Sequence, residues 1–244
     1  MRHLPRKDLD ERTKRYLKKL TEKVANAQNP KKQAESSWNT KGKASFEKIR
    51  SKLTEMASGH SRCMYCEDSY GTDIDHFWPK SVYPHKTFTW NNYLLACSHC
   101  NSNQKRQEFP LDGGGAPLLI DPTEDIPHNH LTFTPTTGKF VGTDKKGTET
   151  IRVFGLNDDE SPRKLPVGRR QTLIKLFALL KAYSTEIKNG AGNEEIYKET
   201  IIDTPFSYVL YWLIDVASKP GAQAVIEDEI LEIISDNNVA SWLN

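Results

Sequence analysis

The chain has no long hydrophobic run. No apolar stretch in its 244 residues approaches the roughly 18 residues that a membrane-spanning helix needs. A secretory signal segment and internal repeats are also not evident in the sequence. We therefore expect a soluble, intracellular protein of the cytoplasm, long enough to bury one sizeable core or to divide into two units.

A strong net charge is also missing. The 34 Lys and Arg side chains nearly balance the 32 Asp and Glu side chains, so the average charge favours no class of partner. The distribution is uneven, because residues 1–62 contain 17 basic and 7 acidic residues, whereas residues 63–244 contain 17 and 25. The basic N-terminal segment is consistent with attraction to nucleic-acid phosphates, although a helical region with a solvated basic face would give the same composition.

Cysteine is scarce, and all four cysteines lie in two pairs. Cys63 and Cys66 form one Cys-x-x-Cys pair, and Cys97 and Cys100 form the other. This spacing is typical of a four-cysteine zinc site, in which each tight turn directs two thiolates at one tetrahedral ion. Disulfides are the alternative, but paired knuckles in an intracellular protein favour metal. Four thiolates would fill the coordination shell, so we predict a structural rather than a catalytic zinc ion.

An insert of thirty residues separates the two cysteine pairs, more than the roughly 15–20 of a simple four-cysteine finger. Within it, Asp75 and His76 come where β-favouring residues predict the end of a short strand, since Pro79 prevents further pairing. Residues 78–90 are typical of a compact surface loop, and a helix is expected to begin at the second knuckle, over residues 98–106. Two asparagines, Asn92 and Asn101, stand close to the second pair of cysteines.

The segment from Cys63 to Lys105 resembles the HNH endonuclease family in the order and spacing of these residues. The sequence motif of that family consists of Asp-His, then a central Asn, then Cys-x-x-Cys followed by Asn or His and a basic residue. The resemblance implies an α+β fold, with a ββα-metal motif on a treble-clef-like zinc-knuckle scaffold. It also implies a metal-dependent hydrolysis of phosphodiester bonds.

Carried over by position, the resemblance implies a role for each polar residue. His76 would be the general base that activates water, and Asp75 and Asn101 would bind a catalytic divalent cation. Asn92 would brace the loop and orient His76. The family often has His where this chain has Asn101, a difference that bears on the choice of metal. Singly, each of these residues has a plainer explanation as a turn former, a helix cap or a surface hydrogen-bonding group.

The chemistry of the residue types agrees with these roles. Imidazole has an intrinsic pKa suited to deprotonating water near pH 7, and a cation would neutralise charge on the phosphate and the leaving oxygen. An oxygen-rich site favours Mg²⁺, with Mn²⁺ as a substitute. Asp73 is expected to support the site from behind Asp75. Phosphate contacts are predicted at Lys80, Lys105 and Arg106, which could equally belong to a solvated face.

The flanks of the motif are expected to differ in structure. In a basic arm over residues 1–62, apolar residues recur at helical spacing on either side of a polar loop at 28–43, which predicts two helices. Residues 63–110 hold the motif. Residues 111–160 form a connector in which 131–140 and 148–154 read as strands, and its glycine triplet lacks the features of a phosphate-binding loop. Residues 161–244 are predicted to be mostly helical, with apolar stripes that serve as core or as a partner surface.

A narrower resemblance extends over about residues 60–180. It rests on Cys-x-Tyr-Cys-Glu at 63–67, Ile-Asp-His-Phe-x-Pro-Lys-Ser at 74–81, Trp-x-Asn at 90–92 and Val-Phe-Gly-Leu-Asn at 153–157. These segments are similar to the PtuB family of HNH subunits from Septu-type anti-phage systems, including those attached to retrons. The resemblance implies a PtuA-like ATPase partner of the ABC or SMC type, and in a retron a reverse transcriptase with its RNA-linked DNA.

Three functions follow from the sequence. The first is an endonuclease that cuts DNA, as most of the HNH family does. The second is the same enzyme with RNA, such as transfer RNA, as its target. The third is a zinc-organised binding module without activity, which the intact set of Asp75, His76, Asn92 and Asn101 disfavours. No recognisable element reads bases, so the sequence does not distinguish the first two functions.

Overall fold

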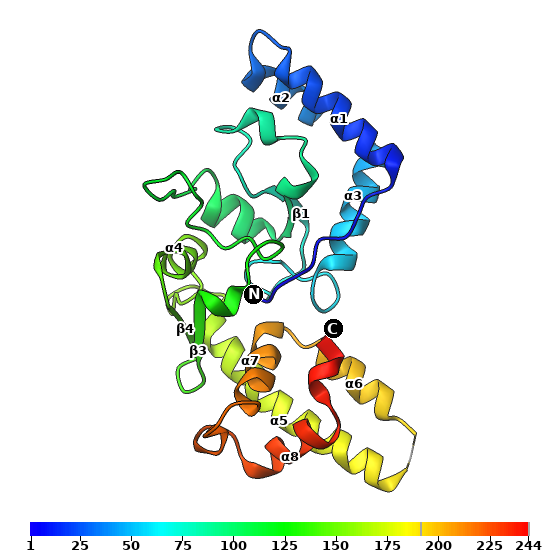
Figure 1. Cartoon of the computed structure of the whole chain (residues 1–244), viewed down its shortest axis with the longest axis vertical. Helices are drawn as coiled ribbons and strands as arrows, with labels where there is room; N and C mark the ends of the chain where they lie inside the picture. Colours follow the sequence, from blue (N-terminus) through cyan, green and yellow to red (C-terminus); the bar gives the residue numbers. More distant parts are fainter. Residues whose placement is uncertain (191, 244) are drawn as a thin grey trace.

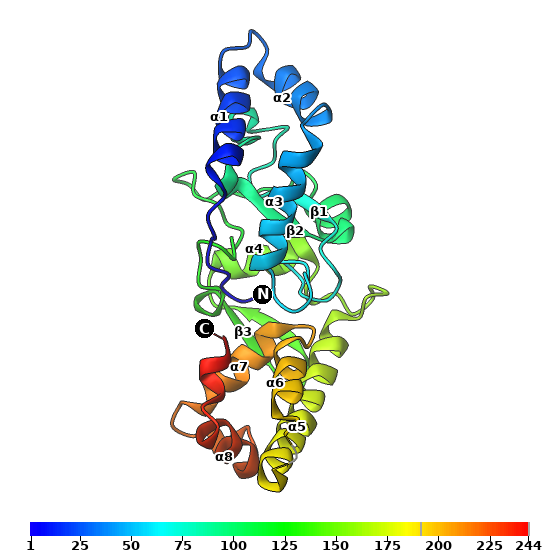
Figure 2. The same cartoon turned by 90° about the vertical axis from the view of Figure 1, so that its right-hand side faces the viewer.

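The computed structural model describes residues 1–190 and 192–243, in which helices surround two small sheets (Figure 1). The helices α1 and α2 lie at one end of the long axis, and α5 to α8 lie at the other (Figure 2). Between them lie the sheet β1–β2 and the cysteine knuckles. No helix in these ranges is long and apolar enough to cross a membrane.

Three helices form the N-terminal region: α1 at Glu11–Ala25, α2 at Pro30–Asn39 and α3 at Lys43–Met56. The predicted polar loop at 28–43 is wrong, because α2 occupies most of it. The Asn29 side chain accepts a hydrogen bond from the Lys32 amide, and Pro30 supplies a favourable first helical residue. These end signals outweigh the polar composition of the segment.

The central sheet pairs β1 at Asp73–His76 with β2 at Tyr93–Ala96 in an antiparallel register. His76 stands opposite Tyr93, and Asp73 stands opposite Ala96. The predicted strand ending at His76 is therefore present. Beyond β2, the expected helix begins at the second knuckle and takes the form of a short π-helix, η3, at His99–Lys105. The pairing of β1 with β2, followed by η3, places the two ends of the thirty-residue insert side by side.

The connector contains a second hairpin, β3 at Leu131–Thr134 and β4 at Lys139–Gly142, followed by helix α4 at Lys145–Phe154. The β structure predicted at 131–140 is present as this hairpin, but the strand expected at 148–154 is part of α4. Asp144 caps this helix by accepting a hydrogen bond from the Gly147 amide, and Gly155 ends it in the left-handed conformation, with φ of 58°. The capping interactions at both helix ends therefore outweigh the strand preference of the β-branched residues between them.

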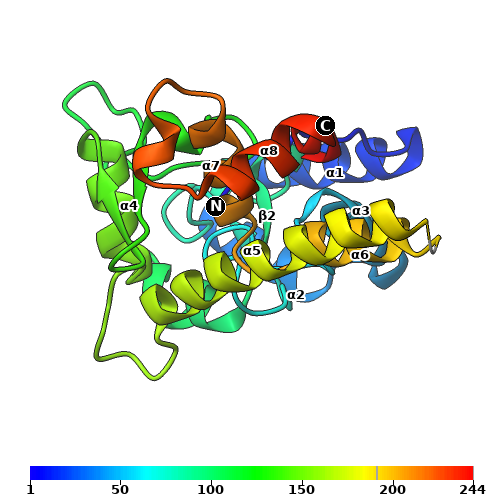
Figure 3. The same cartoon turned by 90° about the horizontal axis from the view of Figure 1, so that it is seen from below.

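Long helix α5, Leu165–Asn189, organises the C-terminal region (Figure 3). It packs against α6 at Glu194–Ile202, α7 at Ser207–Ala217 and α8 at Asp228–Asp236, with the short helix η6 at Val239–Leu243 beside them. The prediction of a mostly helical C-terminal region is confirmed.

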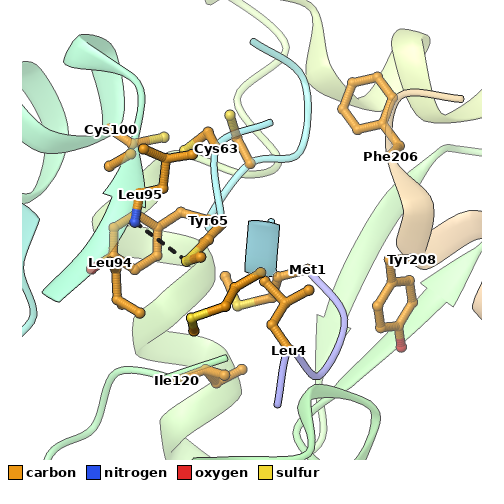
Figure 4. Close-up of a cluster of buried hydrophobic side chains, with 14 of the residues drawn as sticks. Met1, Leu4, Cys63, Tyr65, Leu94, Leu95, Cys100, Ile120, Phe206 and Tyr208 are labelled. Carbon is orange, nitrogen blue, oxygen red and sulfur yellow. Dashed lines mark hydrogen bonds between the residues drawn. The ribbon is translucent and has the colours of Figure 1, made fainter. Parts of the chain in front are cut away.

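The hydrophobic core continues from the knuckles into the C-terminal region (Figure 4). Tyr65, between the first two cysteines, stacks on Phe154 of α4 with ring centroids 4.1 Å apart. Buried Glu67 accepts hydrogen bonds from the Ser207 hydroxyl and the Tyr208 amide at the start of α7. These contacts fix α4 and α7 directly to the first knuckle.

The tight approach of α4 to the second hairpin gives a test of the packing. A Cβ atom at Gly147 would overlap the carbonyl oxygen of His130, so Gly147→Ala should lower the free energy of unfolding by about 1–3 kcal/mol. At an open helical position the same change would stabilise by up to about 1 kcal/mol. Gly113→Ala is the matched control, because a Cβ there meets no atom within 4 Å. Denaturant unfolding of both variants measures the difference, and a neutral Gly147→Ala would contradict the packing.

Candidate functional site

The four cysteines converge in the core. Cys63, Cys66, Cys97 and Cys100 are all buried, and their Sγ atoms lie within 4.8 Å of one another. Tetrahedral thiolate coordination has Zn–S distances near 2.3 Å, which requires such a separation between sulfurs. The donor set therefore fits one zinc ion with no open position. The predicted four-cysteine cluster is present as a possible zinc site.

A guanidinium group from a distant segment contacts this cluster. Arg163 Nη2 donates to Cys66 Sγ at 2.8 Å, and its Nη1 lies 3.7 Å from Cys100 Sγ. Burial alone would lower the pKa of Arg163, but the charges of Cys66 and Cys100 raise it overall. Burial also opposes ionisation of the Cys66 thiol, yet hydrogen bonds from the other cysteines and the charge of Arg163 hold its pKa well below the usual value. Arg163 thus compensates part of the negative charge of the thiolates.

Asp75 lies near the end of β1 in a buried polar network. Its carboxylate accepts a hydrogen bond of 2.5 Å from the Tyr65 hydroxyl, and the Lys105 ammonium lies 2.9 Å and 3.1 Å from its two oxygens. Lys105 is fully buried and also donates to the His76 carbonyl oxygen. The predicted phosphate contact at Lys105 is therefore not supported, because its ammonium faces Asp75 instead of solvent.

His76 has one ring nitrogen fixed by the surrounding loop. Its Nε2 lies 3.0 Å from the carbonyl oxygen of Thr87. A carbonyl oxygen only accepts hydrogen bonds, so Nε2 carries the proton of the neutral ring and Nδ1 is the basic nitrogen. Burial lowers the pKa of His76 to about 3, opposed by the charge of Asp75 and reinforced by that of Lys80. The side chain is neutral at physiological pH.

Asn92 ties together the loop that carries Thr87. Its Oδ1 accepts from the Trp78 amide at 2.7 Å, and its Nδ2 donates to the carbonyl oxygens of Trp78 and Lys86. The amide group is buried and fully occupied by these three contacts. Asn92 therefore acts on His76 only through the loop.

Asn101 is oriented by the other acidic residue of β1. Its Nδ2 donates to Asp73 Oδ2 at 3.0 Å, and its Oδ1 has no hydrogen-bond partner among residues 1–190 and 192–243. Asn101 lines a cleft of about 360 Å³. Asp75 and His76, at the end of β1, line the same cleft, as do two of the residues predicted to contact phosphate, Lys80 and Arg106. Its lining includes Trp38, Asp75, His76, Lys80, Asn101 and Arg106.

The cleft offers two hard oxygen donors for a divalent cation, the Asp75 carboxylate and the Asn101 amide oxygen. Mg²⁺ often keeps several waters and uses only one or two protein ligands. Asp75 and Asn101 are the residues that would hold such an ion, and the Asp75 carboxylate would then interact with both the ion and the Lys105 ammonium. Sequence reasoning missed Lys105 as a partner of Asp75, Arg163 as a partner of the cysteines, and Trp38 as a wall of the cleft. Each is a long-range contact, and spacing along the chain contains no sign of it.

Comparison with known proteins agrees with this geometry. The HNH endonuclease family model matches residues 63–107. A Septu protein PtuB from Bacillus mycoides (strain KBAB4) is 28% identical over 169 residues, which cover 57% of this chain and 57% of the relative. A Septu protein PtuB from Bacillus thuringiensis is 30% identical over 151 residues, covering 58% and 55%. The chain thus spans just over half the length of these relatives. No solved structure matches it.

The contact between Arg163 and the thiolates predicts a measurable effect on metal affinity. Arg163→Met should weaken zinc binding roughly 10–100-fold, because a group outside the coordination shell that stabilises the ligands is lost. Competition with a chromophoric zinc chelator measures the affinity, and elemental analysis gives the stoichiometry. Arg170→Met is the control, because Arg170 is an exposed arginine in the first turns of α5, a few residues after Arg163. Equal zinc affinity in both variants would show that Arg163 contributes only to packing. A purified protein that contains no zinc would contradict the zinc site itself.

Trp38 provides a test of the environment of His76. Burial is the largest cause of the low pKa of His76, and the Trp38 ring packs edge-on against the imidazole at 4.4 Å. Trp38→Leu should therefore raise the pKa of His76 from about 3 by roughly one unit or more. NMR titration of isotope-labelled histidine follows the change. Trp90→Leu is the matched control, since Trp90 does not contact this ring, and an equal shift in both variants would refute the assignment.

Proposed function

We propose that the chain is a metal-dependent endonuclease that hydrolyses phosphodiester bonds of nucleic acid at the cleft beside β1. The observation that carries this proposal is the arrangement of His76, Asp75 and Asn101 on one cleft within a segment that matches the HNH endonuclease family. His76 is neutral, with Nδ1 available as a base, and the two oxygen ligands stand beside it. A general base and a cation site are the two components that phosphodiester hydrolysis requires.

In the proposed reaction, His76 accepts a proton at Nδ1 from the attacking water while Thr87 holds Nε2. Asn92 keeps Thr87 in place by bracing its loop, and Asp73 keeps the Asn101 amide in the orientation that exposes its oxygen. A divalent cation held by Asp75 and Asn101, Mg²⁺ with Mn²⁺ as substitute, would neutralise charge on the phosphate and the leaving oxygen.

The low pKa of His76 in the free protein has two consequences. It keeps the base unprotonated over the whole physiological range, and it makes the free imidazole a weak base. A phosphate bound beside the ring stabilises the protonated form by its negative charge and so raises the pKa. Substrate binding therefore strengthens the base at the moment when it is used.

The cellular role follows from the relatives named Septu protein PtuB. We propose that this chain is the effector nuclease of an anti-phage defence complex with a PtuA-like ATPase of the ABC or SMC type. In a retron-associated system, the complex would also include a reverse transcriptase and its RNA-linked DNA. The helical C-terminal region and the N-terminal arm are the proposed docking surfaces for the ATPase.

DNA is the favoured substrate, and cleavage assays test this choice directly. Plasmid DNA and total cellular RNA are incubated with Mg²⁺ and the protein, alone and with a PtuA-like ATPase. We expect plasmid cleavage that falls about 10²–10⁴-fold in His76→Ala, the usual contribution of a general base. His85→Ala, an exposed histidine on the same loop, is the control and should cut normally.

Each other outcome of these assays has a defined meaning. Cleavage of RNA alone would transfer the proposal to an RNase. Folded, zinc-loaded protein that cuts neither nucleic acid under any of these conditions would contradict the nuclease and favour a binding module. Equal loss of activity in both histidine variants would show that His76 is not the base.

A further inference from the structure

Helix α2 reaches the cleft through one aromatic side chain. Trp38, near the end of α2, packs on His76 with ring centroids 4.4 Å apart and lines the same cleft. The helix belongs to the N-terminal region, outside the segment that matches the HNH family. Part of the wall of the proposed active site is therefore built by residues that precede the motif.

Two lysine ammonium groups lie over the same indole ring. The Lys41 Nζ lies 4.2 Å from the ring centroid of Trp38, and the Lys80 Nζ lies 5.7 Å from it. Lys41 also donates to the Trp38 carbonyl oxygen at 3.0 Å. Such contacts with an aromatic face stabilise a cation by about 0.5–2 kcal/mol. The indole that packs on His76 thus contacts both positive charges.

Neither ammonium has a carboxylate within 4.0 Å among residues 1–190 and 192–243, although both side chains are half-buried. Other lysines of the N-terminal region do have such partners, as Lys14 has with Glu11 and Lys52 has with Glu55. Burial and the neighbouring charge of Lys80 together lower the pKa of Lys41. An anion at this place would relieve the repulsion between the two cations.

The rest of the cleft adds positive rather than negative charge. Arg106 is exposed along its lining, and the one acidic residue of the lining, Asp75, is already paired with Lys105. Of the two lysines, Lys80 lines the cleft directly, and Lys41 lies over the Trp38 ring that forms part of the cleft wall. A bound polyanion would place its phosphates against these side chains.

We propose that Lys41 and Lys80 form a phosphate-binding subsite for the nucleic-acid backbone beside His76, with Trp38 holding both lysines in place. The inference rests on the proposed nuclease function and extends it, because it makes α2 and Lys41 part of the substrate site. Both lysines would contact phosphates of the nucleic-acid backbone. The subsite would therefore increase the affinity for nucleic acid and position it in the cleft, without reading the base sequence.

Salt dependence of binding tests this subsite without any cleavage. Anisotropy of a labelled duplex DNA oligonucleotide is measured over a range of KCl concentrations, with no added divalent cation and no chelator. Each of Lys41→Gln and Lys80→Gln should weaken binding several-fold and reduce the slope of log K against log salt by about 0.9, the value for one lost phosphate contact. The double variant should lose about twice that amount.

Lys31→Gln, an exposed position on the same helix α2, is the matched control and should change neither affinity nor slope. Thermal unfolding of all variants verifies that they remain folded. An unchanged slope in the double variant, an equal change in the Lys31→Gln control, or a wild-type protein that does not bind the oligonucleotide would each overturn the subsite.

The binding assay tests the subsite and the cleavage assay tests the proposed catalysis, so each proposal can be contradicted independently of the other. If the lysine variants lose binding but wild-type protein cuts no nucleic acid, the subsite stands and the proposed catalysis fails. If cleavage depends on His76 while binding is indifferent to both lysines, the nuclease stands and the subsite fails. A labelled RNA oligonucleotide in the same assay, with an expected slope change of about 0.7 per contact for a single strand, compares the two kinds of substrate.

Discussion

The convergence of four cysteines is the constraint on which the rest of the structure depends. The first knuckle leads into β1, and β2 ends at Ala96, immediately before Cys97. A single ion bound to all four thiolates would therefore close the thirty-residue insert and set the position of each end. Asp75 and His76 lie at one end of this closed loop, and Asn101 follows the last ligand at the other. Binding of zinc by the four thiolates would thus determine how far His76 lies from the oxygen atoms of Asp75 and Asn101.

Burial of polar side chains is the second organising feature of the site. Asp75, His76, Asn92 and Lys105 are each less than a tenth exposed, and each has hydrogen-bond partners. Such a network is costly to desolvate and is retained only when its members satisfy one another. The low pKa of His76 is one result of this burial. The same surroundings fix the tautomer, because the hydrogen-bond partner of Nε2 within residues 1–190 and 192–243 is the carbonyl oxygen of Thr87.

The local parts of the site could be predicted from the sequence, and the distant parts could not. The Cys-x-x-Cys pairs, the strand that ends at His76 and the helix after Cys97 are short-range patterns. The polar composition of residues 28–43 predicts a loop, but Asn29 and Pro30 start helix α2 there. The β-branched residues of 148–154 predict a strand, but Asp144 and Gly155 at the two ends stabilise helix α4 instead. Arg163 reaches Cys66 across 97 residues of chain, and only the folded structure reveals such a partner.

These long-range contacts show that the segment matching the HNH family is not self-sufficient in this protein. Arg163, which compensates the cysteine charge, lies just before α5, and Trp38, which covers His76, comes from α2. Glu67 additionally binds the start of α7 through its carboxylate. Removing either flank would leave a buried charge without its partner or a base open to water, and an unpaired buried charge is far more costly than a lost surface contact. Both flanks therefore contribute to the structure around the site, because α2 supplies Trp38 to the lining of the cleft and the C-terminal region supplies Arg163 to the cysteine cluster.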